Sequence, residues 1–288
     1  MIAVQIFGGL GNQMFQFAAG TALARRHGVD LAINTRFYDV GQPTELDFRL
    51  DRFSLDAVEA DRTRLPARLR DGLGAYLAGR FRRPDYTAYH EPHLAFDPAF
   101  ADLPDQTYLC GYWQCARYFD AIAPEIRDLF TLRDAPTGAN RDTLNAFEKT
   151  MPVSLHIRRG AFVSNPKFYA VHGTCNMDYY HRAAEYIAER AGRDITIYAF
   201  SDEPDWVMGN LKLPFEMKVV AHNGLDHNYE DIRLMSRCRH HIIANSSFSW
   251  WGAWLNPDPD KIVVAPSRWF ADPAMQDHDI LVPEWTTL

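Results

Sequence analysis

The stretch "VSLHIRRGAF", residues 153–162, decides how the rest of the chain is interpreted. It begins as a short apolar run, typical of a buried strand, and then reaches Arg158 and Arg159. Nitrogen-rich side chains at the end of a buried strand are costly to keep away from water unless something binds them. Because ligands bind at the carboxyl ends of strands in open α/β sheets, the two arginines indicate a ligand site at one sheet edge.

Strands and helices alternate around this stretch through the whole C-terminal half. The further expected strands are 195–202, 215–221, 240–246 and 261–266, and the expected helices are 176–192, 204–211, 229–238 and 247–255. Asn176 is placed to cap the first of these helices and Gly192 to end it. Strands that alternate with helices predict a parallel, doubly wound sheet.

The N-terminal half begins in the same way. The expected elements are a strand over 2–7, the turn "GGLGNQ" at 8–13, a helix that Gly28 ends, strands over 29–34 and 107–113, and a helix over 115–130. The stretch "RDAPTGANRD", residues 133–142, is the best linker candidate. We therefore predict an α/β fold of two facing Rossmann-like domains with a cleft between them, over 1–140 and 141–288.

Composition excludes several classes of protein. The formal net charge of −7 argues against nucleic acid as a partner, because a chain-wide basic field is absent. The four cysteines match neither a zinc site nor a CxxC pair, which indicates reduced thiols in a cytoplasmic protein. The first residues do not resemble a signal peptide, and no apolar run in the sequence has the length of a membrane helix.

Residues 62–83 are unusually basic, with seven arginines against a single acid. Leu65, Leu69, Leu73 and Tyr76 lie roughly on one helical face, which would suit peripheral contact with the anionic inner face of a membrane. Gly72 and Gly74 weaken a helix here, so a solvated surface insertion is the favoured alternative. The sequence gives no indication of the oligomeric state.

Polar side chains follow four of the expected C-terminal strands. They are His156 with Arg158, Ser201 with Asp202, His222 with Asn223, and Asn245 with Ser246 and Ser247. Arginine binds phosphate in a two-pronged geometry, and the turn into the helix after Asn245 offers N–H groups and hydroxyls to an anion. We therefore predict a diphosphate site that includes Asp202 and Asn245. The alternative is that the arginines only cap carbonyls or pair with surface acids.

Strand alternation separates the two arginines, because His156 and Arg158 share a face and Arg159 points the other way. Asp231 begins the helix over 229–238. A carboxylate there is able to accept the paired N–H groups of guanine. The favoured alternative, on spacing alone, is an acid that interacts with the helix dipole.

The turn at 8–13 carries part of a dinucleotide fingerprint, Gly9 and Gly11, but Met14 occupies the third glycine position. The next strand ends in Asn34, where a nicotinamide-binding domain has an acid for the ribose, so the indication of NAD is weak. A glycine turn that brings backbone close to a ligand is the alternative interpretation, with Asn12 at the mouth of the cleft and Gln13 in the same loop.

No metal is expected. The acid pairs of "DPD", 258–260, and "DHD", 277–279, lie among loop residues and not at the end of a long apolar strand. The helix over 247–255 carries Trp250, Trp251 and Trp254, which are suited to stacking on a sugar. Packing between helix and sheet is the commoner use of such residues and is the favoured interpretation.

Taken together, six segments resemble the landmarks of the bacterial α-1,2-fucosyltransferases. They are "GGLGNQMFQFA", "GYWQCARYF", "HIRRG", "FSDEPDWV", "EDIRLMSRC" and "IIANSSFSWWGAWLN", and they follow one another through most of the chain. The resemblance implies a GT-B fold and inverting transfer of L-fucose from GDP-β-L-fucose to a galactoside hydroxyl of a glycan. It also implies an α-1,2 linkage and no metal or other cofactor.

The resemblance further implies that the C-terminal domain binds the donor and the N-terminal domain the acceptor. Arg158 matches the arginine that holds the diphosphate, and Asn12 matches an asparagine near the transfer site. The further donor contacts that match are His156, Asp231, Ser246 and Ser247. Asp178 and Asp202 are the candidate bases for the acceptor hydroxyl.

One position departs from the family pattern, which usually continues as HxRRxD. This chain has Ala161 where the acid is expected. The departure leaves open a different acceptor, a shifted acid or lower activity. The alternative functions are a catalytically weak or inactive binder of sugar nucleotides or glycans, and a nicotinamide-dependent oxidoreductase built on the same fold.

Overall fold

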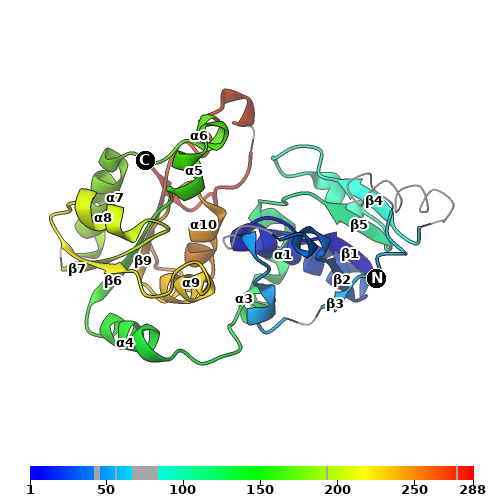
Figure 1. The fold of residues 1–288 in the computed structure, drawn as a ribbon, viewed down its shortest axis with the longest axis horizontal. Helices are drawn as coiled ribbons and strands as arrows, with labels where there is room; N and C mark the ends of the chain where they lie inside the picture. The colour runs from blue at the N-terminus through cyan, green and yellow to red at the C-terminus, as the bar shows by residue number, and fades with distance from the viewer. Residues whose placement is uncertain (42–45, 56, 67–83, 193, 277) are drawn as a thin grey trace. The chain divides into compact units, whose positions relative to one another are not determined.

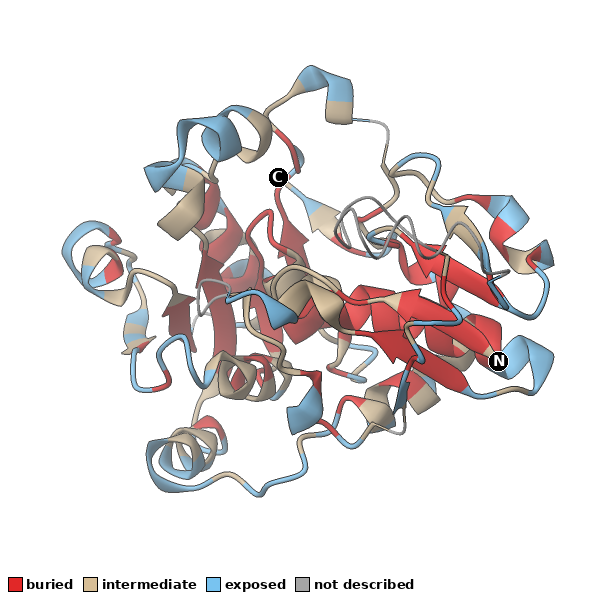
Figure 2. Ribbon diagram, turned by 45° about the vertical axis from the view of Figure 1, so that its right-hand side comes forward, coloured by how far each residue is buried: buried red, intermediate tan, exposed pale blue. Residues whose placement is uncertain are grey.

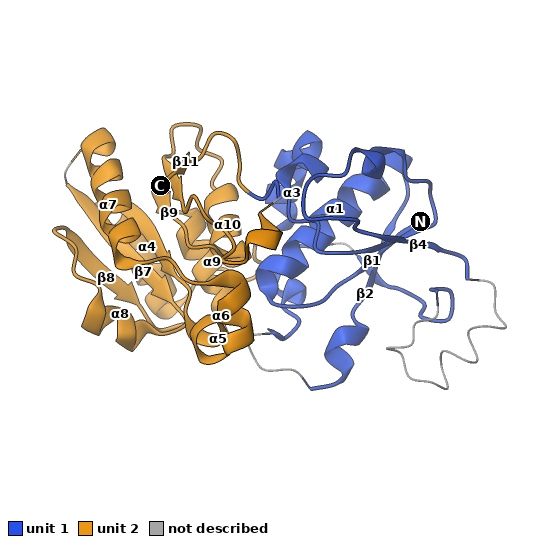
Figure 3. Ribbon diagram, turned by 90° about the horizontal axis from the view of Figure 1, so that it is seen from above, with its two compact units in different colours: residues 1–131, 278–280 blue, residues 132–277, 281–288 orange. Residues whose placement is uncertain are grey.

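The computed structural model describes residues 1–41, 46–55, 57–66, 84–192, 194–276 and 278–288. The chain divides into two compact units (Figure 3): unit 1 is residues 1–131 with 278–280, and unit 2 is residues 132–277 with 281–288. The division at 131–132 lies before the expected one at 140–141. Asp279 belongs to unit 1, where its carboxylate accepts the Phe96 N–H at 2.8 Å and lies 3.5 Å from an Arg117 nitrogen.

Unit 1 is built on a parallel sheet whose described strands follow the order β3-β2-β1-β5-β4 (Figure 1). These strands are β1 (Ile2–Gln5), β2 (Leu31–Asn34), β3 (Val58–Glu59), β4 (Thr87–His90) and β5 (Thr107–Cys110). Helix α1 (Leu10–His27) packs closely on the sheet, since a Cβ atom at Gly20 would lie 2.9 Å from Leu31. Gly28 ends α1 in the left-handed conformation, with φ 63°, as predicted.

Unit 2 is built on a second parallel sheet, with the order β11-β10-β9-β6-β7-β8. Its strands are β6 (Met151–Ile157), β7 (Ile195–Ser201), β8 (Glu216–Val220), β9 (His240–Ile242), β10 (Val263–Ala265) and β11 (Thr286–Thr287). Counted from its first strand, this is the 3-2-1-4-5-6 order of dinucleotide-binding sheets, whose strand order reverses between the first and fourth strands. The reversal in unit 2 therefore lies between β6 and β9.

The helices of unit 2 cover this sheet. They are α4 (Gly138–Phe147), α5 (Gly160–Ser164), α6 (Pro166–His172), α7 (Met177–Ala191), α8 (Pro204–Asn210), α9 (Asn228–Ser236) and α10 (Ser247–Trp254). The predicted cap of α7 is confirmed, because the Asn176 side chain accepts the Tyr179 N–H at 2.8 Å. The central strands of both sheets are coloured as buried in Figure 2, and α7 adds Ala184 and Ile187 to the core of unit 2.

The tryptophans of α10 pack in the interior, as expected. Trp250 and Trp251 are fully buried, and their ring centroids lie 5.0 Å apart. The Trp254 ring stacks on Trp250 at 5.9 Å. Gly252 brings α10 close to α9, because a Cβ atom there would lie 2.8 Å from the Met235 side chain. These rings therefore stabilise the layer behind the sheet edge and do not form a sugar platform.

Several expected elements were wrong. The helix expected over 115–130 is three pieces: 3-10 turns at Ala116–Tyr118 and Asp120–Ile122, then α3 (Ala123–Leu129). Phe119, with φ −136°, breaks the first part, and Pro124 suits the first turn of α3. Helix α4 begins inside the expected linker, and α5 and α6 were not predicted. Further 3-10 turns are Arg36–Asp39, Leu50–Arg52, Pro98–Asp102 and Pro273–Met275.

The α/β class of the GT-B type, with two Rossmann-like parallel sheets, is confirmed. The cleft between the two units stays a prediction. In the part of the chain that is described, no helix has the length and hydropathy needed to cross a membrane. Most of the arginine-rich segment, residues 67–83, lies outside the described residues, so membrane contact and a cytoplasmic location also stay predictions.

Candidate functional site

The polar residues of unit 2 gather at the reversal of its strand order. Arg158 follows β6, and Ser246 follows β9, the two strands that flank the reversal. Strands β6 and β9 are paired in parallel, with Leu155 opposite Ile242. Their carboxyl ends therefore open on the same edge of the sheet. This is the position at which open α/β sheets bind nucleotides.

Arg158 and Arg159 bind different partners, as their alternation predicts. The Arg158 Nη1 donates to Asp202 Oδ2 at 2.7 Å, and its guanidinium lies 5.4 Å from the centre of the Phe162 ring. The Arg159 Nε donates to Glu203 at 2.9 Å, and its guanidinium lies 3.7 Å from the centre of the Trp206 ring. Arg159 is thus held against the start of α8, whereas Arg158 is held by Asp202, the acid that follows β7.

His156 is buried near the end of β6, with 4% of its surface exposed. Its ring centroid lies 5.5 Å from that of Phe248, in the first turn of α10. Burial, and to a lesser extent the charge of Arg158, lowers the pKa of His156 to about 3, so the imidazole is neutral. Among the described residues its Nδ1 has no hydrogen-bond partner. An unsatisfied buried nitrogen is rare in folded proteins and suits a position that a ligand completes.

The start of α10 presents its backbone to the same edge. Ser246 precedes the helix in an extended conformation, with φ −142° and ψ 125°, and Ser247 is its first residue. The first N–H groups of an α-helix have no partner within the helix, and the helix dipole favours an anion beside them. Ser246 makes no side-chain cap to the helix. Both serines thus lie where an anion would meet the end of α10.

Asn245 has a more structural position than the sequence indicates. Its amide nitrogen donates to the carbonyl oxygens of His172, at 2.8 Å, and of Trp269, at 3.1 Å. Its amide oxygen accepts the Cys175 thiol at 3.7 Å. Asn245 therefore links the end of α6 to the segment before α7 and to the segment after β10. Its expected contact with a donor stays a prediction.

Asp231 lies in the first turn of α9 and belongs to a chain of amide side chains. Asn223 Nδ2 donates to Asp231 at 2.7 Å and to Asn140 at 3.0 Å. Asn140 donates back to Asn223 at 2.8 Å and accepts from His222 at 2.8 Å. Burial raises the pKa of Asp231 to about 7, although the hydrogen bond from Asn223 lowers it. Asp231 is thus a carboxyl group whose charge changes near neutral pH.

The two candidate bases differ in environment. Asp178 lies in the first turn of α7, its side chain is 73% exposed, and its carboxylate accepts from Arg182 at 2.9 Å. Asp202 is 9% exposed, and both of its oxygens accept bonds, one from Arg158 and one from the Arg159 N–H. A general base needs a carboxylate that is near the reacting hydroxyl and available to take its proton. Asp178 is the more accessible of the two carboxylates, and the part of either group as base stays a prediction.

Unit 1 reverses its strand order between β1 and β5, and amides meet there. Gly8 has φ 80°, and a Cβ atom there would lie 2.9 Å from the Asn12 amide nitrogen. Asn12, after β1, accepts from Gln114, after β5, at 2.7 Å. Gly9 precedes α1, and Gly11 lies within it. The sequence analysis missed Gly8 and Gln114, although Gln114 stands in the quoted segment "GYWQCARYF".

Gln13 anchors the glycine turn of unit 1. It is fully buried and donates to the carbonyl oxygens of Gly8, at 3.0 Å, and Asp47, at 2.8 Å. Its own oxygen accepts the Arg49 N–H at 3.0 Å. Met14, in the third glycine position, is also fully buried. Gln13 therefore supports the loop from inside.

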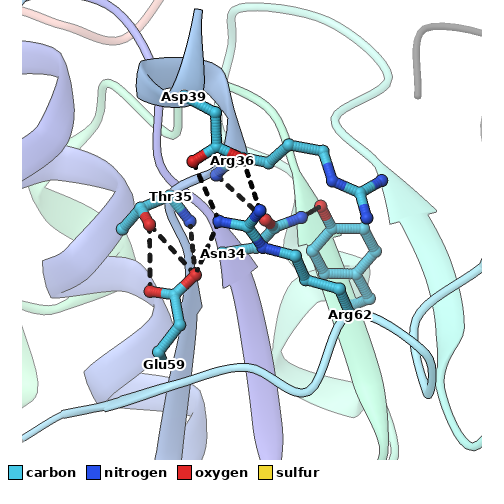
Figure 4. Close-up of polar contacts among 7 residues, drawn as sticks. Asn34, Thr35, Arg36, Asp39, Glu59 and Arg62 are labelled. Atoms are coloured by element: carbon cyan, nitrogen blue, oxygen red, sulfur yellow. Dashed lines mark hydrogen bonds and ion pairs between the residues drawn. The ribbon is translucent and has the colours of Figure 1, made fainter. Parts of the chain in front are cut away.

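The end of β2 does not resemble a ribose site (Figure 4). Asn34 donates to the Tyr108 hydroxyl at 2.7 Å, and Thr35 donates to Glu59 at 3.0 Å. Arg62 pairs with Asp39 and lies 3.5 Å from Glu59. The exposed charges of this network satisfy one another. The acid that would hold a nicotinamide ribose at the end of the second strand is replaced by an amide.

The comparison with known proteins decides the family. The family described as "Glycosyl transferase family 11" matches residues 1–288 of this chain. The chain belongs to glycosyl transferase family 11. The O-antigen biosynthesis glycosyltransferase WbnK of Escherichia coli is 32% identical over 92% of this chain and 93% of its own length. An alpha-1,2-colitosyltransferase of Escherichia coli is 29% identical over 100% of this chain and 99% of its own length.

More distant relatives of this family 11 glycosyltransferase include a eukaryotic enzyme. The galactoside 2-alpha-L-fucosyltransferase Sec1 of Mus musculus is 25% identical over 99% of this chain and 71% of its own length. Among solved structures, a mutant of Arabidopsis thaliana FUT1 in complex with GDP has a TM-score of 0.48 at 12% identity, over 95% of this chain and 73% of that one. The sheet topology described above, and not this likeness, establishes the fold.

Proposed function

We propose that this chain transfers L-fucose from GDP-β-L-fucose to a galactoside hydroxyl of a glycan, with inversion and an α-1,2 linkage. Membership of family 11 supports glycosyl transfer. Relatives named for α-1,2 transfer and for galactoside fucosylation support the linkage and the acceptor. The observation that carries the proposal is the meeting of Arg158 and the start of α10 at the strand-order reversal of unit 2.

The donor site proposed for unit 2 follows from the charge of the reaction. Cleavage of the sugar–phosphate bond places negative charge on GDP as the sugar leaves. Arg158 and the first N–H groups of α10 are preorganised donors for that charge, and the hydroxyls of Ser246 and Ser247 add to them. Neutral His156 contributes a hydrogen bond from its buried Nδ1, and Asp231 accepts the paired N–H groups of guanine.

The acceptor is proposed to bind at unit 1, through the amides at the β1–β5 reversal. Asn12 and Gln114 offer both donors and acceptors, which suits a sugar hydroxyl. A leaving group that is strongly stabilised allows an oxocarbenium-like transition state. The hydroxyl then loses its proton late, so a weak base suffices. This is compatible with the exposed position of Asp178 and the fully bonded carboxylate of Asp202.

We also propose that transfer requires no metal. No group of three or more His, Cys, Asp or Glu side chains suited to a metal ion occurs among the residues that the structure describes. Asp258 pairs with Arg239, and Asp279 with Arg117. The test is transfer in excess EDTA, where we expect an unchanged rate. Activity that EDTA removes and manganese or magnesium restores would contradict the proposal.

The experiment that tests the function is transfer from GDP-fucose to a panel of galactose-containing glycans, with the product linkage determined by NMR. We expect an α-1,2-linked fucose and release of GDP. GDP should raise the melting temperature in a thermal-shift assay, and UDP and NAD should raise it much less. Equal shifts for GDP and UDP would remove the guanine assignment of Asp231.

Two alternatives have a specific observation in their favour. The full-length similarity to an alpha-1,2-colitosyltransferase favours a colitosyl donor, which a parallel assay with that donor would reveal as the faster reaction. Ala161, in place of the family's acid, favours a binder of sugar nucleotides with little activity. Tight GDP-fucose binding without turnover on any acceptor would establish that second alternative.

A further inference from the structure

Asp202 joins the end of β7 to the turn between β6 and α5, at the carboxyl edge of the sheet. It follows β7, whose Ser201 lies opposite Ile157 of β6. Its Oδ2 accepts from Arg158 Nη1 at 2.7 Å, and its Oδ1 accepts the backbone N–H of Arg159 at 3.0 Å. With 9% of its side chain exposed, Asp202 is the less exposed partner of the pair, since Arg158 is 21% exposed. One carboxylate therefore fixes both a guanidinium and the backbone turn that carries it.

The turn after β6 is shaped around this carboxylate. A Cβ atom at Gly160 would lie 2.3 Å from Asp202 Oδ2, closer than real contacts allow. Only glycine therefore fits at position 160 without a steric clash with Asp202. Any side chain at this position would push the carboxylate away from Arg158 or open the turn. The absence of a side chain at residue 160 is thus a second, independent sign that the Asp202 carboxylate is built into the site.

This arrangement suits a positioning role better than a role as base. A guanidinium has five N–H donors in one plane, so a bond from Nη1 to Asp202 sets that plane and is compatible with a further two-pronged contact to a diphosphate. If Asp202 accepted a proton from a sugar hydroxyl, it would lose its negative charge and its ion pair with Arg158 would weaken at the moment when charge on the diphosphate grows.

We propose that Asp202 is the positioning residue for Arg158 and holds its guanidinium in the orientation that binds the leaving diphosphate. In this chain the carboxylate near the "HIRRGA" turn comes from Asp202, the residue after strand β7, whereas residue 161 is an alanine. The proposal rests on the proposed function, because it assigns Asp202 a part in the same reaction. It goes beyond that function because it assigns Asp202 an effect on Arg158 and no direct contact with the substrate.

The structure offers a matched control one residue away. Glu203 holds Arg159 at 2.9 Å much as Asp202 holds Arg158, and it has no assigned part in the reaction. Asp202→Asn and Glu203→Gln each remove one negative charge from an arginine pair. We expect Asp202→Asn to lower kcat about 10- to 100-fold through misplacement of Arg158, with a smaller change in the KM for GDP-fucose. Glu203→Gln should change kcat less than about threefold.

The deciding experiment is a double-mutant cycle between Asp202→Asn and Arg158→Lys, with steady-state turnover and GDP affinity both measured. If Asp202 acts through Arg158, its loss should matter little once Arg158 is lysine, so the two losses will not multiply. Asp202→Glu keeps the charge, and we expect it to recover part of the rate. Melting temperatures serve as the folding control for each variant.

Several results would overturn the proposal. Parental turnover in Asp202→Asn, or losses that multiply in full, would show that Asp202 does not act through Arg158. A pH–rate profile that loses its acidic limb only in Asp202→Asn would make Asp202 the base. If the parent binds GDP but transfers nothing, the proposed function fails. The positioning role then stands or falls on whether the GDP affinities of the cycle are non-additive. A parent that does not bind GDP overturns both.

Discussion

The two strand-order reversals of this chain have different chemistry. The edge of unit 2 carries the ion pair of Arg158 and Asp202, a neutral buried His156 and the start of α10. The edge of unit 1 carries an amide pair, Asn12 with Gln114, beside a glycine turn. A charged diphosphate needs preorganised cations and N–H groups, whereas a neutral sugar hydroxyl needs only balanced donors and acceptors. The two strand-order reversals thus differ in the way that the proposed division between a donor unit and an acceptor unit requires.

The largest effect that would sharpen this comparison is expected for Arg158→Lys. Lysine keeps the charge but loses the planar contact with the diphosphate, whose charge is greatest as the sugar leaves. We expect turnover to fall roughly 10²- to 10³-fold, or about 3 to 4 kcal/mol, with a smaller loss of donor binding. Arg159→Lys should lose much less, because Arg159 is held by Glu203 and Trp206. Steady-state kinetics on both folded variants is the measurement, and near-parental turnover of Arg158→Lys would remove its role.

The next largest effect is the pH dependence of GDP binding, which we expect from Asp231 in unit 2. Because burial raises the pKa of Asp231 to about 7, its carboxyl gains a proton as the pH falls through that value. Only the ionised form accepts two N–H groups from guanine, so GDP should bind about tenfold more weakly one pH unit below the pKa. Calorimetric GDP titrations at pH values about one unit either side of this pKa would measure the change in affinity.

The matched control for this pH effect is Asp231→Asn, which lacks the titrating carboxyl. Its GDP affinity should be low and should lose the part of the pH dependence that Asp231 contributes. The phosphate groups of GDP titrate in both proteins and therefore cancel in the comparison. An identical pH profile in parent and variant would assign Asp231 to the alternative role of an acid in the first turn of α9.

A smaller effect is expected at unit 1. Asn12→Ala removes one neutral hydrogen bond, worth about 0.5 to 1.5 kcal/mol, or roughly 2- to 13-fold. We expect this loss in kcat/KM for the acceptor glycan, with the Kd for GDP unchanged. Gln114→Ala, which removes the partner amide, should show the same pattern. A weakened GDP affinity in either variant would break the division between the two edges.

The smallest effect is expected for Ala161→Asp, which introduces, in the first turn of α5, the acid that the sequence resemblance implies there. An acid at a helix N-terminus stabilises by about 0.3 to 1 kcal/mol, so the variant should fold with an equal or slightly higher melting temperature. Because Asp202 already binds Arg158, we expect a second carboxylate to compete for the guanidinium and lower turnover by less than about tenfold. Kinetics equal to the parent's would make position 161 irrelevant.

The sequence alone predicted the elements whose pattern is strongest. The buried parallel strands β6 and β7 are long runs of mostly apolar residues, and α7 has both a cap and a regular apolar stripe. The short helices α5 and α6 were missed because five and seven residues show little periodicity. Pro166 opens α6 as Pro204 opens the equally short α8, so the proline indicated one of these two helices and was overlooked at the other. Helix α4 was missed because its first turn carries the glycine and asparagine that usually mark a linker.

The sequence predicted which residues of the candidate site lie at strand ends. It did not predict which side chains bind one another. Parallel strands align their carboxyl ends, so the convergence of Arg158 and Ser246 follows from the order of elements. The partner of Arg158 does not, because Asp202 is 44 residues away in the sequence and β6 and β7 had to be placed in register first. The burial of Asp231 and the anchoring of Asn245 likewise depend on side chains from distant loops.

The central claim is that the donor diphosphate binds at the β6–β9 edge of unit 2. Hydrogen–deuterium exchange with and without GDP tests it most directly, since bound phosphate protects the backbone N–H groups that it contacts. We predict slower exchange in peptides that cover 156–164 and 245–250, and unchanged exchange in peptides that cover 5–16. Protection confined to the glycine turn of unit 1, with none at the start of α10, would contradict the account.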